Sequence, residues 1–385
     1  MKLAYVTTYD AGSLKGSNEW SGTGYYIAQS LKNQSIPIEY IGPLEDTVIA
    51  RAIHKFKRHY YDLLKQKNYQ KDADPLTLKH YANQVAKKLN STKSDIIFSA
   101  TVNAIAYLEC DRPMAFWADG TFANIQNFYP QYSNLPEEVI QDWHQMEKLA
   151  LQKSKLAIYS SDWAAQSAIN DYGADPNRVK VVAFGSNTDS PFNSETIKDV
   201  ISSRKSDRCK LLFLGVDWIR KGGNIAYEVT ERLNQSGLKT ELTIVGCSPM
   251  LDSPIPDFVK PLGFIKKATQ EGQNRINQLL MESHFLILPT IADCTPIVFA
   301  EANSLGVPCL STTVGGVPTM IHNDVNGQLF DQDTEISEYC DYISRLFCNY
   351  SDYKNLALSS FNEYESRLNW KMAGQKVKEL LMPLL

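Results

Sequence analysis

Short apolar runs alternate with longer amphipathic stretches along most of this chain. Glycine, proline and polar residues bound the runs, which is typical of buried strands, and apolar residues at helical spacing fill the stretches between them. The predicted strands are 3–8, 38–41, 95–99, 114–117, 156–159, 179–182, 210–214, 241–245, 284–289 and 307–310. The clearest predicted helices are 25–33, 224–235, 268–282 and 297–305. This alternation predicts an α/β chain with two doubly wound parallel sheets.

Two segments interrupt the alternation. Residues 45–93 contain a basic helical stretch, and residues 186–207 are polar and are interpreted as a linker. A chain of 385 residues exceeds what one hydrophobic core usually serves. The linker therefore predicts two domains, 1–188 and 189–365, followed by a closing segment, 366–385.

Composition narrows the class of protein. The chain carries 39 Lys and Arg against 43 Asp and Glu, a net charge of −4, which argues against a general nucleic-acid binder. No apolar run is long enough to cross a bilayer and the chain opens directly as a strand, so we expect neither a membrane span nor a signal peptide. The 7 cysteines form no C-x-x-C pair and the 6 histidines have no metal-ligand spacing. These features predict a reducing, cytoplasmic location and no metal site.

Ligands of doubly wound sheets bind at the carboxyl ends of the strands, and three loops there carry candidate chemistry. In the first loop, Arg220 and Lys221 lie among glycines before a helix, which suits a diphosphate, although a solvated turn would have the same composition. In the third loop, Gly315 and Gly316 would let the backbone approach a phosphate, although a tight strand–helix turn would use the same pair.

The second loop, at residues 290–302, places one acid at a strand end and another in the following helix. Asp293 is where a ligand can reach it, and Glu301 lies one turn further on, within reach of a ribose diol. Thr295 and Pro296 are predicted to be the N-cap and the first residue of that helix. The amides expected to point into the shared space belong to Thr295, Ile297 and Val298. Alternatively, Asp293 is a turn residue and Glu301 a helix-surface acid.

The order of these motifs resembles the retaining family 4 glycosyltransferases of GT-B fold, within the glycosyl transferases group 1. The motifs are Lys221-Gly222, then Asp293 and Glu301, then Gly315-Gly316 with Pro318. Supporting stretches are Trp20–Gly24, Tyr159–Trp163, Phe184–Asn187 and Trp370 before the closing helix. The resemblance implies a Rossmann-like acceptor-binding domain at 1–188, a Rossmann-like nucleotide-sugar domain at 189–365, and a closing helix that packs back on the first domain.

The resemblance also implies roles for individual residues. Lys221 and Arg220 would hold the diphosphate, Glu301 the ribose, and Asp293 the hydroxyls of the donor sugar. The implied catalytic residues are Asp119, Arg220, Lys221, Asp293 and Glu301. The implied donor-binding residues are Gly22, Gly24, Gly215, Arg220, Lys221, Thr295, Pro296, Ile297, Val298, Glu301, Gly315 and Gly316.

Four positions depart from the family pattern. The family usually has Glu where Asp293 stands, often has Arg where Val216 stands, and frequently has Glu where Thr319 stands. Many relatives also have His where Ala118 stands. We expect Arg220 to supply the charge missing at Val216. We expect Asp119 to replace the missing histidine as a polar contact, unless it is only a turn acid before Gly120.

The implied function is transfer of a hexosyl unit from a UDP- or GDP-sugar to a hydroxyl acceptor, with retention of configuration and without a metal or cofactor. The acceptor could be a sugar, a glycan, a lipid or a small metabolite. The acid pairs at 72–74 and 331–333 lie outside the nucleotide-facing loops, which favours metal independence. A nucleotide-sugar epimerase, a phosphorylase and a non-catalytic nucleotide-sugar binder stay open as alternatives.

The basic stretch at residues 51–71 adds one further expectation. It contains a single acid, Asp62, and interleaved aromatic residues. Its cations are Arg51, Lys55, Lys57, Arg58, Lys65, Lys67 and Lys71. A basic amphipathic helix can lie on anionic lipid at the inner face of a membrane, which would make the protein peripheral. A solvated helix on the acceptor side is the other interpretation.

Overall fold

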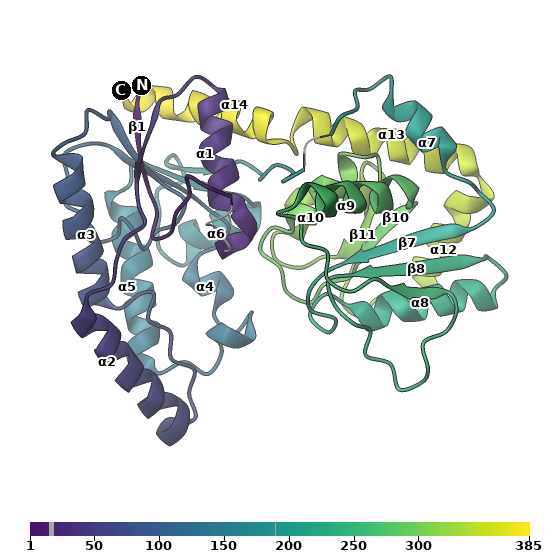
Figure 1. The fold of residues 1–385 in the computed structure, drawn as a ribbon, viewed down its shortest axis with the longest axis horizontal. Helices are drawn as coiled ribbons and strands as arrows, with labels where there is room; N and C mark the ends of the chain where they lie inside the picture. The colour runs from purple at the N-terminus through teal and green to yellow at the C-terminus, as the bar shows by residue number, and fades with distance from the viewer. Residues whose placement is uncertain (15–18, 189) are drawn as a thin grey trace. The chain divides into compact units, whose positions relative to one another are not determined.

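The computed structural model describes residues 1–14, 19–188 and 190–385, and Figure 1 shows them as two α/β units. Unit 1 comprises residues 1–183 and 373–385, and unit 2 comprises residues 184–372. Each unit contains a six-stranded sheet in which neighbouring strands pair in parallel. The predicted α/β class with two parallel sheets is confirmed.

The sheet of unit 1 has the strand order β2-β1-β3-β4-β5-β6. Its strands are β1 (Leu3–Val6), β2 (Ile38–Ile41), β3 (Ile96–Ser99), β4 (Met114–Ala118), β5 (Leu156–Tyr159) and β6 (Val179–Val181). The helices are α1 (Thr23–Asn33), α2 (Val48–His59), α3 (Pro75–Leu89), α4 (Phe122–Ile125), α5 (Glu137–Lys153) and α6 (Asp162–Asn170), with a π-helical turn η2 (Tyr60–Lys65) directly after α2. The four inner strands are buried along their whole length, as parallel strands covered on both faces must be.

The sheet of unit 2 has the strand order β12-β11-β10-β7-β8-β9. Its strands are β7 (Cys209–Leu214), β8 (Thr240–Val245), β9 (Val259–Pro261), β10 (Phe285–Leu288), β11 (Cys309–Thr312) and β12 (Gly327–Phe330). Its helices are α7 (Ile197–Ser203), α8 (Gly223–Gln235), α9 (Gln270–Glu282), α10 (Ile297–Asn303), α11 (Val317–Met320), α12 (Ile336–Cys348) and α13 (Tyr350–Ser366). β10 therefore lies beside β7 and β11, so the three candidate loops leave adjacent strands.

The predicted linker is wrong, because residues 186–207 are part of unit 2. Ile197 and Ile201 on α7 are fully or almost fully buried, and the Arg204 side chain is buried as well. The guanidinium of Arg204 donates to the carbonyl oxygens of Leu305 and Gly306, each at 2.6 Å. These carbonyls lie in the turn after α10, which ends at Asn303, and the buried guanidinium satisfies them.

The last helix, α14 (Trp370–Leu381), contains the second division between the units, which falls between Met372 and Ala373. Its later residues lie against α1. Gly374 leaves no room for a side chain beside the Ser30 carbonyl, and the Lys378 ammonium donates to the Gln34 carbonyl at 2.9 Å. The first division falls between Ala183 and Phe184, a few residues before the position that the sequence suggested.

Candidate functional site

The first and second candidate loops of unit 2 are fastened together through Arg220. The Arg220 carbonyl accepts hydrogen bonds from the Ile291 amide at 2.9 Å and from the Thr290 hydroxyl at 3.0 Å. The Arg220 guanidinium in turn donates to the Ala292 carbonyl at 2.8 Å. These bonds join the loop after β7 to the loop after β10, so the charged residues that follow keep a fixed spacing.

Close packing between these loops requires the glycine that follows Lys221. Gly222 has φ +76°, and a Cβ there would collide with the Pro289 carbonyl. It is the N-cap of α8. The turn directs Lys221 toward Asp293, and the two side chains form an ion pair.

The Asp293 carboxylate lies between two cations. Its Oδ2 pairs with the Lys221 ammonium and lies 3.9 Å from Nη1 of Arg220. The side chains of Lys221 and Asp293 are only 13% and 12% exposed, so this pairing is largely shielded from solvent. The predicted cations and the first acid are therefore brought together, and Arg220 lies where it can supply charge beside Lys221. Val216, at the position where relatives often have Arg, is exposed.

The third loop joins the same assembly. The Gly316 amide donates to the Asp293 carbonyl at 3.1 Å, and Gly315 has φ +52°, a conformation that favours glycine. The Gly316 amide therefore binds the neighbouring loop, and the assignment of Gly316 to the donor stays a prediction. Gly215 also has an internal partner, because its amide donates to the Val245 carbonyl at 3.0 Å.

The helix that carries Glu301 begins at Ile297, as the predicted segment 297–305 does, but its cap differs from the prediction. Pro296 has ψ 102° and is the N-cap of α10, without a side-chain cap, so the prediction of Thr295 as N-cap and Pro296 as first helical residue is wrong. Thr295 lies just before the cap and is nearly buried. The amides of Ile297 and Val298 lie in the first turn, where α-helical amides have no partner within the helix.

Glu301 has a partner that the sequence did not suggest. Its carboxylate, whose side chain is 3% exposed, forms an ion pair with the ammonium of Lys267. Lys267 lies between β9 and α9, in a loop that follows a strand absent from the prediction. A signal was present in the sequence, since Lys266 and Lys267 follow a glycine and precede Thr269, which caps α9 through its hydroxyl.

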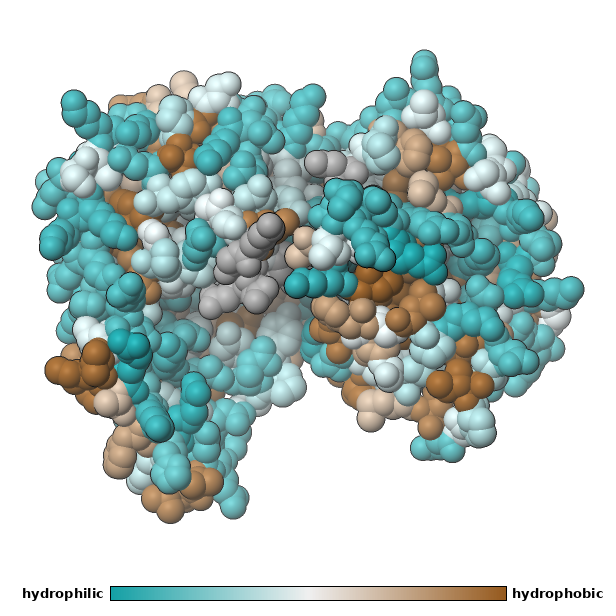
Figure 2. All heavy atoms as spheres, in the orientation of Figure 1, coloured by the Kyte–Doolittle hydropathy of each residue, from teal (hydrophilic) through white to brown (hydrophobic). Residues whose placement is uncertain are grey.

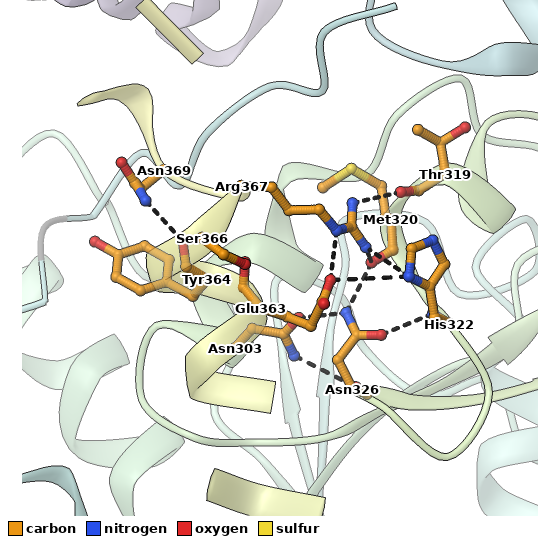
Figure 3. A network of polar contacts seen from close by, with 10 residues as sticks. All are labelled: Asn303, Thr319, Met320, His322, Asn326, Glu363, Tyr364, Ser366, Arg367 and Asn369. Carbon is orange, nitrogen blue, oxygen red and sulfur yellow. Dashed lines mark hydrogen bonds and ion pairs between the residues drawn. The ribbon is translucent and has the colours of Figure 1, made fainter. Parts of the chain in front are cut away.

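A polar network holds the far end of this assembly, as Figure 3 shows. Arg367 donates to the Thr319 carbonyl at 2.7 Å and to the Met320 carbonyl at 3.3 Å, at the C-terminus of α11. Asn326 donates to Met320 at 2.8 Å and to the Asn303 side chain on α10 at 2.7 Å. The helix bearing Glu301 and the helix after Gly315 are therefore tied to each other and to the end of α13.

The predicted residues of unit 1 also lie near one another. Gly22 is the N-cap of α1 with φ +81°, and a Cβ on Gly24 would collide with the Tyr9 ring. The Trp20 indole donates to Oδ2 of Asp119 at 2.9 Å, which joins the loop before α1 to the loop after β4. Gly22, Gly24 and Asp119 belong to unit 1, and the other predicted site residues belong to unit 2.

A buried acid supports the loop that bears Asp119. Oε1 of Glu147, on α5, accepts a hydrogen bond from the Phe122 amide at 3.2 Å, at the start of α4. Among the residues that the structure describes, its other oxygen has no hydrogen-bond partner. Burial raises the pKa of Glu147 to about 8, and the Phe122 amide only partly offsets this. The raised pKa favours the neutral form of Glu147 at pH 7, in which it anchors the loop without adding charge.

No metal-binding group appears within the ranges 1–14, 19–188 and 190–385, where no three His, Cys, Asp or Glu side chains are placed to hold an ion. Asp74, from one of the two acid pairs, instead caps α3 by accepting hydrogen bonds from the Leu76 and Thr77 amides, both at 3.1 Å. Across the same ranges, none of the helices has the length and apolar character that crossing a bilayer requires.

Known sequences match the part of unit 2 that contains these loops. Residues 208–349 match the family model described as Glycosyl transferases group 1. The amylovoran biosynthesis glycosyltransferase AmsK of Erwinia amylovora is 25% identical over 176 residues, which cover 42% of each chain. A UDP-Gal:α-D-GlcNAc-diphosphoundecaprenol α-1,3-galactosyltransferase of Escherichia coli is 21% identical over 169 residues, covering 42% of this chain and 44% of that one. The matches therefore span less than half of these curated relatives.

Comparison with solved structures extends over both units. The sucrose-phosphate synthase of Thermosynechococcus elongatus superposes with a TM-score of 0.68 at 14% identity, covering 100% of this chain and 99% of that one. Anabaena HepE, solved with UDP and glucose, gives a TM-score of 0.62 at 17% identity and covers 99% of each chain. At these identities the likeness establishes the fold. Residues 208–349 match the group 1 glycosyl transferases, and the chain as a whole has the GT-B fold.

Proposed function

We propose that this chain is a retaining glycosyltransferase of family 4 that transfers a hexosyl unit from a nucleotide-diphospho-sugar to a hydroxyl acceptor. The observation that carries the proposal is the joined set of loops in unit 2. They hold Lys221, Arg220 and Asp293 within one cluster and place Glu301 on the helix that follows it. The cluster lies inside the segment that matches the group 1 family.

Lys221 and Arg220 would stabilise the negative charge of the leaving diphosphate. Breaking the bond between the sugar and the diphosphate leaves negative charge on the diphosphate, and preplaced cations stabilise that charge as it develops. Lys221 and Arg220 lie on a loop that is fixed by backbone hydrogen bonds, so they need no rearrangement at the moment of reaction. With these two positive charges in place, a metal ion is not needed to neutralise the leaving group.

The two acids would exchange partners when the donor binds. The diphosphate would take over the Lys221 ammonium, and Asp293 would then turn to the hydroxyls of the sugar. Glu301 would accept hydrogen bonds from the ribose diol in place of the Lys267 ammonium. Each buried carboxylate would keep a partner in both states, which avoids the cost of leaving a buried charge unpaired.

Two of the similar proteins favour UDP over GDP as the nucleotide. The galactosyltransferase relative is named for UDP-Gal, and HepE was solved with UDP and with UDP-glucose. We therefore propose a UDP-hexose donor. In unit 1, we assign Asp119, Gly22 and Gly24 to contacts with the transferred sugar and the acceptor hydroxyl. The proposed acceptor is a compound with a free hydroxyl group.

A thermal-shift screen across UDP- and GDP-sugars would identify the donor, followed by a product assay on variants. Lys221→Ala and Glu301→Ala should each lower turnover at least about tenfold, which corresponds to about 1.4 kcal/mol or more of lost transition-state stabilisation. Lys239→Ala is the matched control, because Lys239 is an exposed lysine of unit 2 outside the loops, and it should be unchanged. Near-normal turnover in both site variants would contradict the assignment.

The same assay separates the transferase from its alternatives. Incubation of the donor alone would reveal an epimerase through a changed sugar, and incubation with phosphate would reveal a phosphorylase through a sugar phosphate. A non-catalytic binder would show the thermal shift without nucleotide release under any condition. A transferase releases its nucleotide in step with glycosylation of an acceptor, and the anomeric configuration of that product tests retention.

A further inference from the structure

Helix α2 is fastened to unit 1 along one side only. Ala50 and His54 are its buried residues. His54 is held by hydrogen bonds between its two ring nitrogens and the hydroxyls of Tyr69 at 2.8 Å and Thr77 at 2.7 Å. Lys57, on the same side, lies 3.2 Å from Glu138 and 3.9 Å from Asp74. These contacts fix which side of the helix points away from the unit.

The side that points away carries two parallel strips. Successive α-helical residues are rotated by about 100°, so Val48, Ala52 and Phe56 line up along one strip. Arg51 and Lys55, with Arg58 one turn further, line up along the adjacent strip. All six are exposed, and Phe56 is 72% exposed. We call these residues, together with Ile49 and with Leu63 and Leu64 of the following turn η2, the α2 outer face.

The hydrophobic part of the α2 outer face is large for a solvated surface. Val48, Ile49, Phe56, Leu63 and Leu64 are each more than half exposed. Figure 2 shows hydrophobic side chains, in brown, on the projecting part of unit 1 where Figure 1 draws α2, with hydrophilic side chains between them. Such a concentration of exposed apolar residues on one element marks an interaction surface.

The cations of the segment divide into two groups by their partners. Those that point toward the unit are paired, as Lys57 is with Glu138 and Lys71 is with Asp46 at 2.6 Å. In contrast, Arg51, Lys55 and Arg58 form no ion pair with any residue that the structure describes. Arg58 lies near enough to Asp72 for its charge to act on the pKa of that acid. At Arg51 and Lys55 the outer face therefore presents positive charge without a paired acid, on a chain whose net charge is −4.

We propose that the α2 outer face is a docking surface for an anionic lipid bilayer. An apolar strip beside a basic strip on one helix matches the headgroup region of a membrane, where acyl chains take up the apolar side chains and lipid phosphates face the cations. The helix would lie in the plane of the bilayer surface. An acidic protein could also bind a basic surface. We assign lipid because the apolar strip and the basic strip lie side by side along the whole helix.

The test is cosedimentation of the full chain with vesicles of phosphatidylcholine, with or without phosphatidylglycerol. The wild type should partition onto the anionic vesicles and not onto phosphatidylcholine alone, and salt should weaken the binding. Replacing Arg51, Lys55 and Arg58 together with Glu should lower the partition coefficient at least about tenfold. Phe56→Ser combined with Leu64→Ser should lower it by a similar factor, because insertion of apolar side chains is lost.

The matched control reverses the charge of three exposed lysines elsewhere on unit 1. Lys87, Lys88 and Lys93, all changed to Glu, alter the net charge by the same amount but leave the α2 outer face intact. This variant should bind as the wild type does, and circular dichroism should show that all variants melt alike. Absence of wild-type binding, equal loss in the control, or undiminished binding of either α2 variant would overturn the proposal. No donor or acceptor enters the measurement, so its outcome is independent of the proposed transferase activity.

Discussion

Units 1 and 2 have the same type of sheet but use their charges in opposite ways. In unit 2 the cations at the strand ends turn inward and pair with shielded carboxylates, Lys221 with Asp293 and Lys267 with Glu301. In unit 1 the cations of α2 include two that turn outward and form no ion pair with any described residue, Arg51 and Lys55. The strand-end acid of unit 1, Asp119, binds the Trp20 indole.

Under the proposed function, the difference reflects which parts of one fold a single ligand constrains. Residues 208–349 match the group 1 family model, and that segment contains the loops with paired charges. An activated sugar donor has fixed groups at fixed distances, and its site therefore tolerates few changes. Surfaces that meet a membrane or varied acceptors have looser requirements, and the same architecture can carry them on different elements.

The largest expected effect concerns the buried ionisable groups, which also differ between the units. Glu147 of unit 1 has a pKa raised to about 8 by burial, so its neutral form stabilises the fold below the ordinary carboxyl pKa. That contribution is lost as the pH rises through 8. Glu147→Gln should raise the free energy of unfolding by on the order of a few kcal/mol above pH 8 relative to the wild type.

Urea unfolding across pH 5 to 9, in steps of about one unit, measures this effect in the two proteins. Hydrogen exchange of the β4 and α5 amides localises it to unit 1. A wild type whose stability does not fall between pH 5 and 8 would show that Glu147 is ionised in the folded state. The two units would then not differ in the pH dependence of their stability in the way proposed.

An effect of opposite sign, smaller over the pH range of the experiment, is expected in unit 2. Burial, with Arg204 nearby, lowers the pKa of His284 to about 3. The Nδ1 of His284 accepts the Lys210 amide at 3.0 Å, and its Nε2 lies 3.1 Å from the Tyr350 hydroxyl, an arrangement that suits the neutral ring. Its contribution to stability is present above the unfolded pKa and is lost as the pH falls from about 6.5 toward 3.

His284→Gln removes this titration while keeping a polar side chain. The variant should lose less stability than the wild type between pH 6 and 4, measured by urea unfolding and by exchange of the β10 and α13 amides. If both proteins lose stability in parallel over that range, another group controls the acid sensitivity of unit 2. Together, the unfolding measurements on the Glu147 and His284 variants would show whether the stabilities of the two units depend on pH in opposite directions.

The smallest expected effect tests the inward pairing at Glu301. Lys267→Met leaves a buried carboxylate without its cation, and should lower the free energy of unfolding by about 1 kcal/mol, because Lys267 is itself 39% exposed. Lys266→Met, at the exposed neighbouring lysine, is the control and should have no measurable effect. The nucleotide-sugar identified by the screen should stabilise the Lys267 variant more than the wild type, because the ribose diol supplies the missing partner. Equal melting of the two variants would mean that the pair contributes nothing.

Much of the fold follows from local pattern. The strands Ile38–Ile41 and Leu156–Tyr159 are as predicted, and most others differ by one or two residues at an end. The edge strands β9 and β12 were not predicted, since short segments such as Val259–Pro261 carry little periodic signal. α1 begins two residues earlier than predicted because Gly22 adopts the left-handed conformation that caps it.

The linker interpretation failed for a different reason. Residues 186–207 are polar in sequence, yet the buried side of α7 consists of isoleucines four residues apart, and Arg204 is buried against carbonyls that lie about a hundred residues further along the chain. A buried arginine cannot be distinguished from a solvated one until those carbonyls are in place.

The sequence by itself determined the α/β class, the two sheets and the three loops that carry Arg220, Lys221, Asp293 and Gly315, because each rests on residues close together in the chain. Only the tertiary structure decided which charges meet. It paired Lys267 with Glu301, gave the Gly316 amide to Asp293, and left the outer side of α2 apolar, positive and exposed. Pairing and exposure depend on contacts between residues far apart in sequence, and local periodicity contains no record of such contacts.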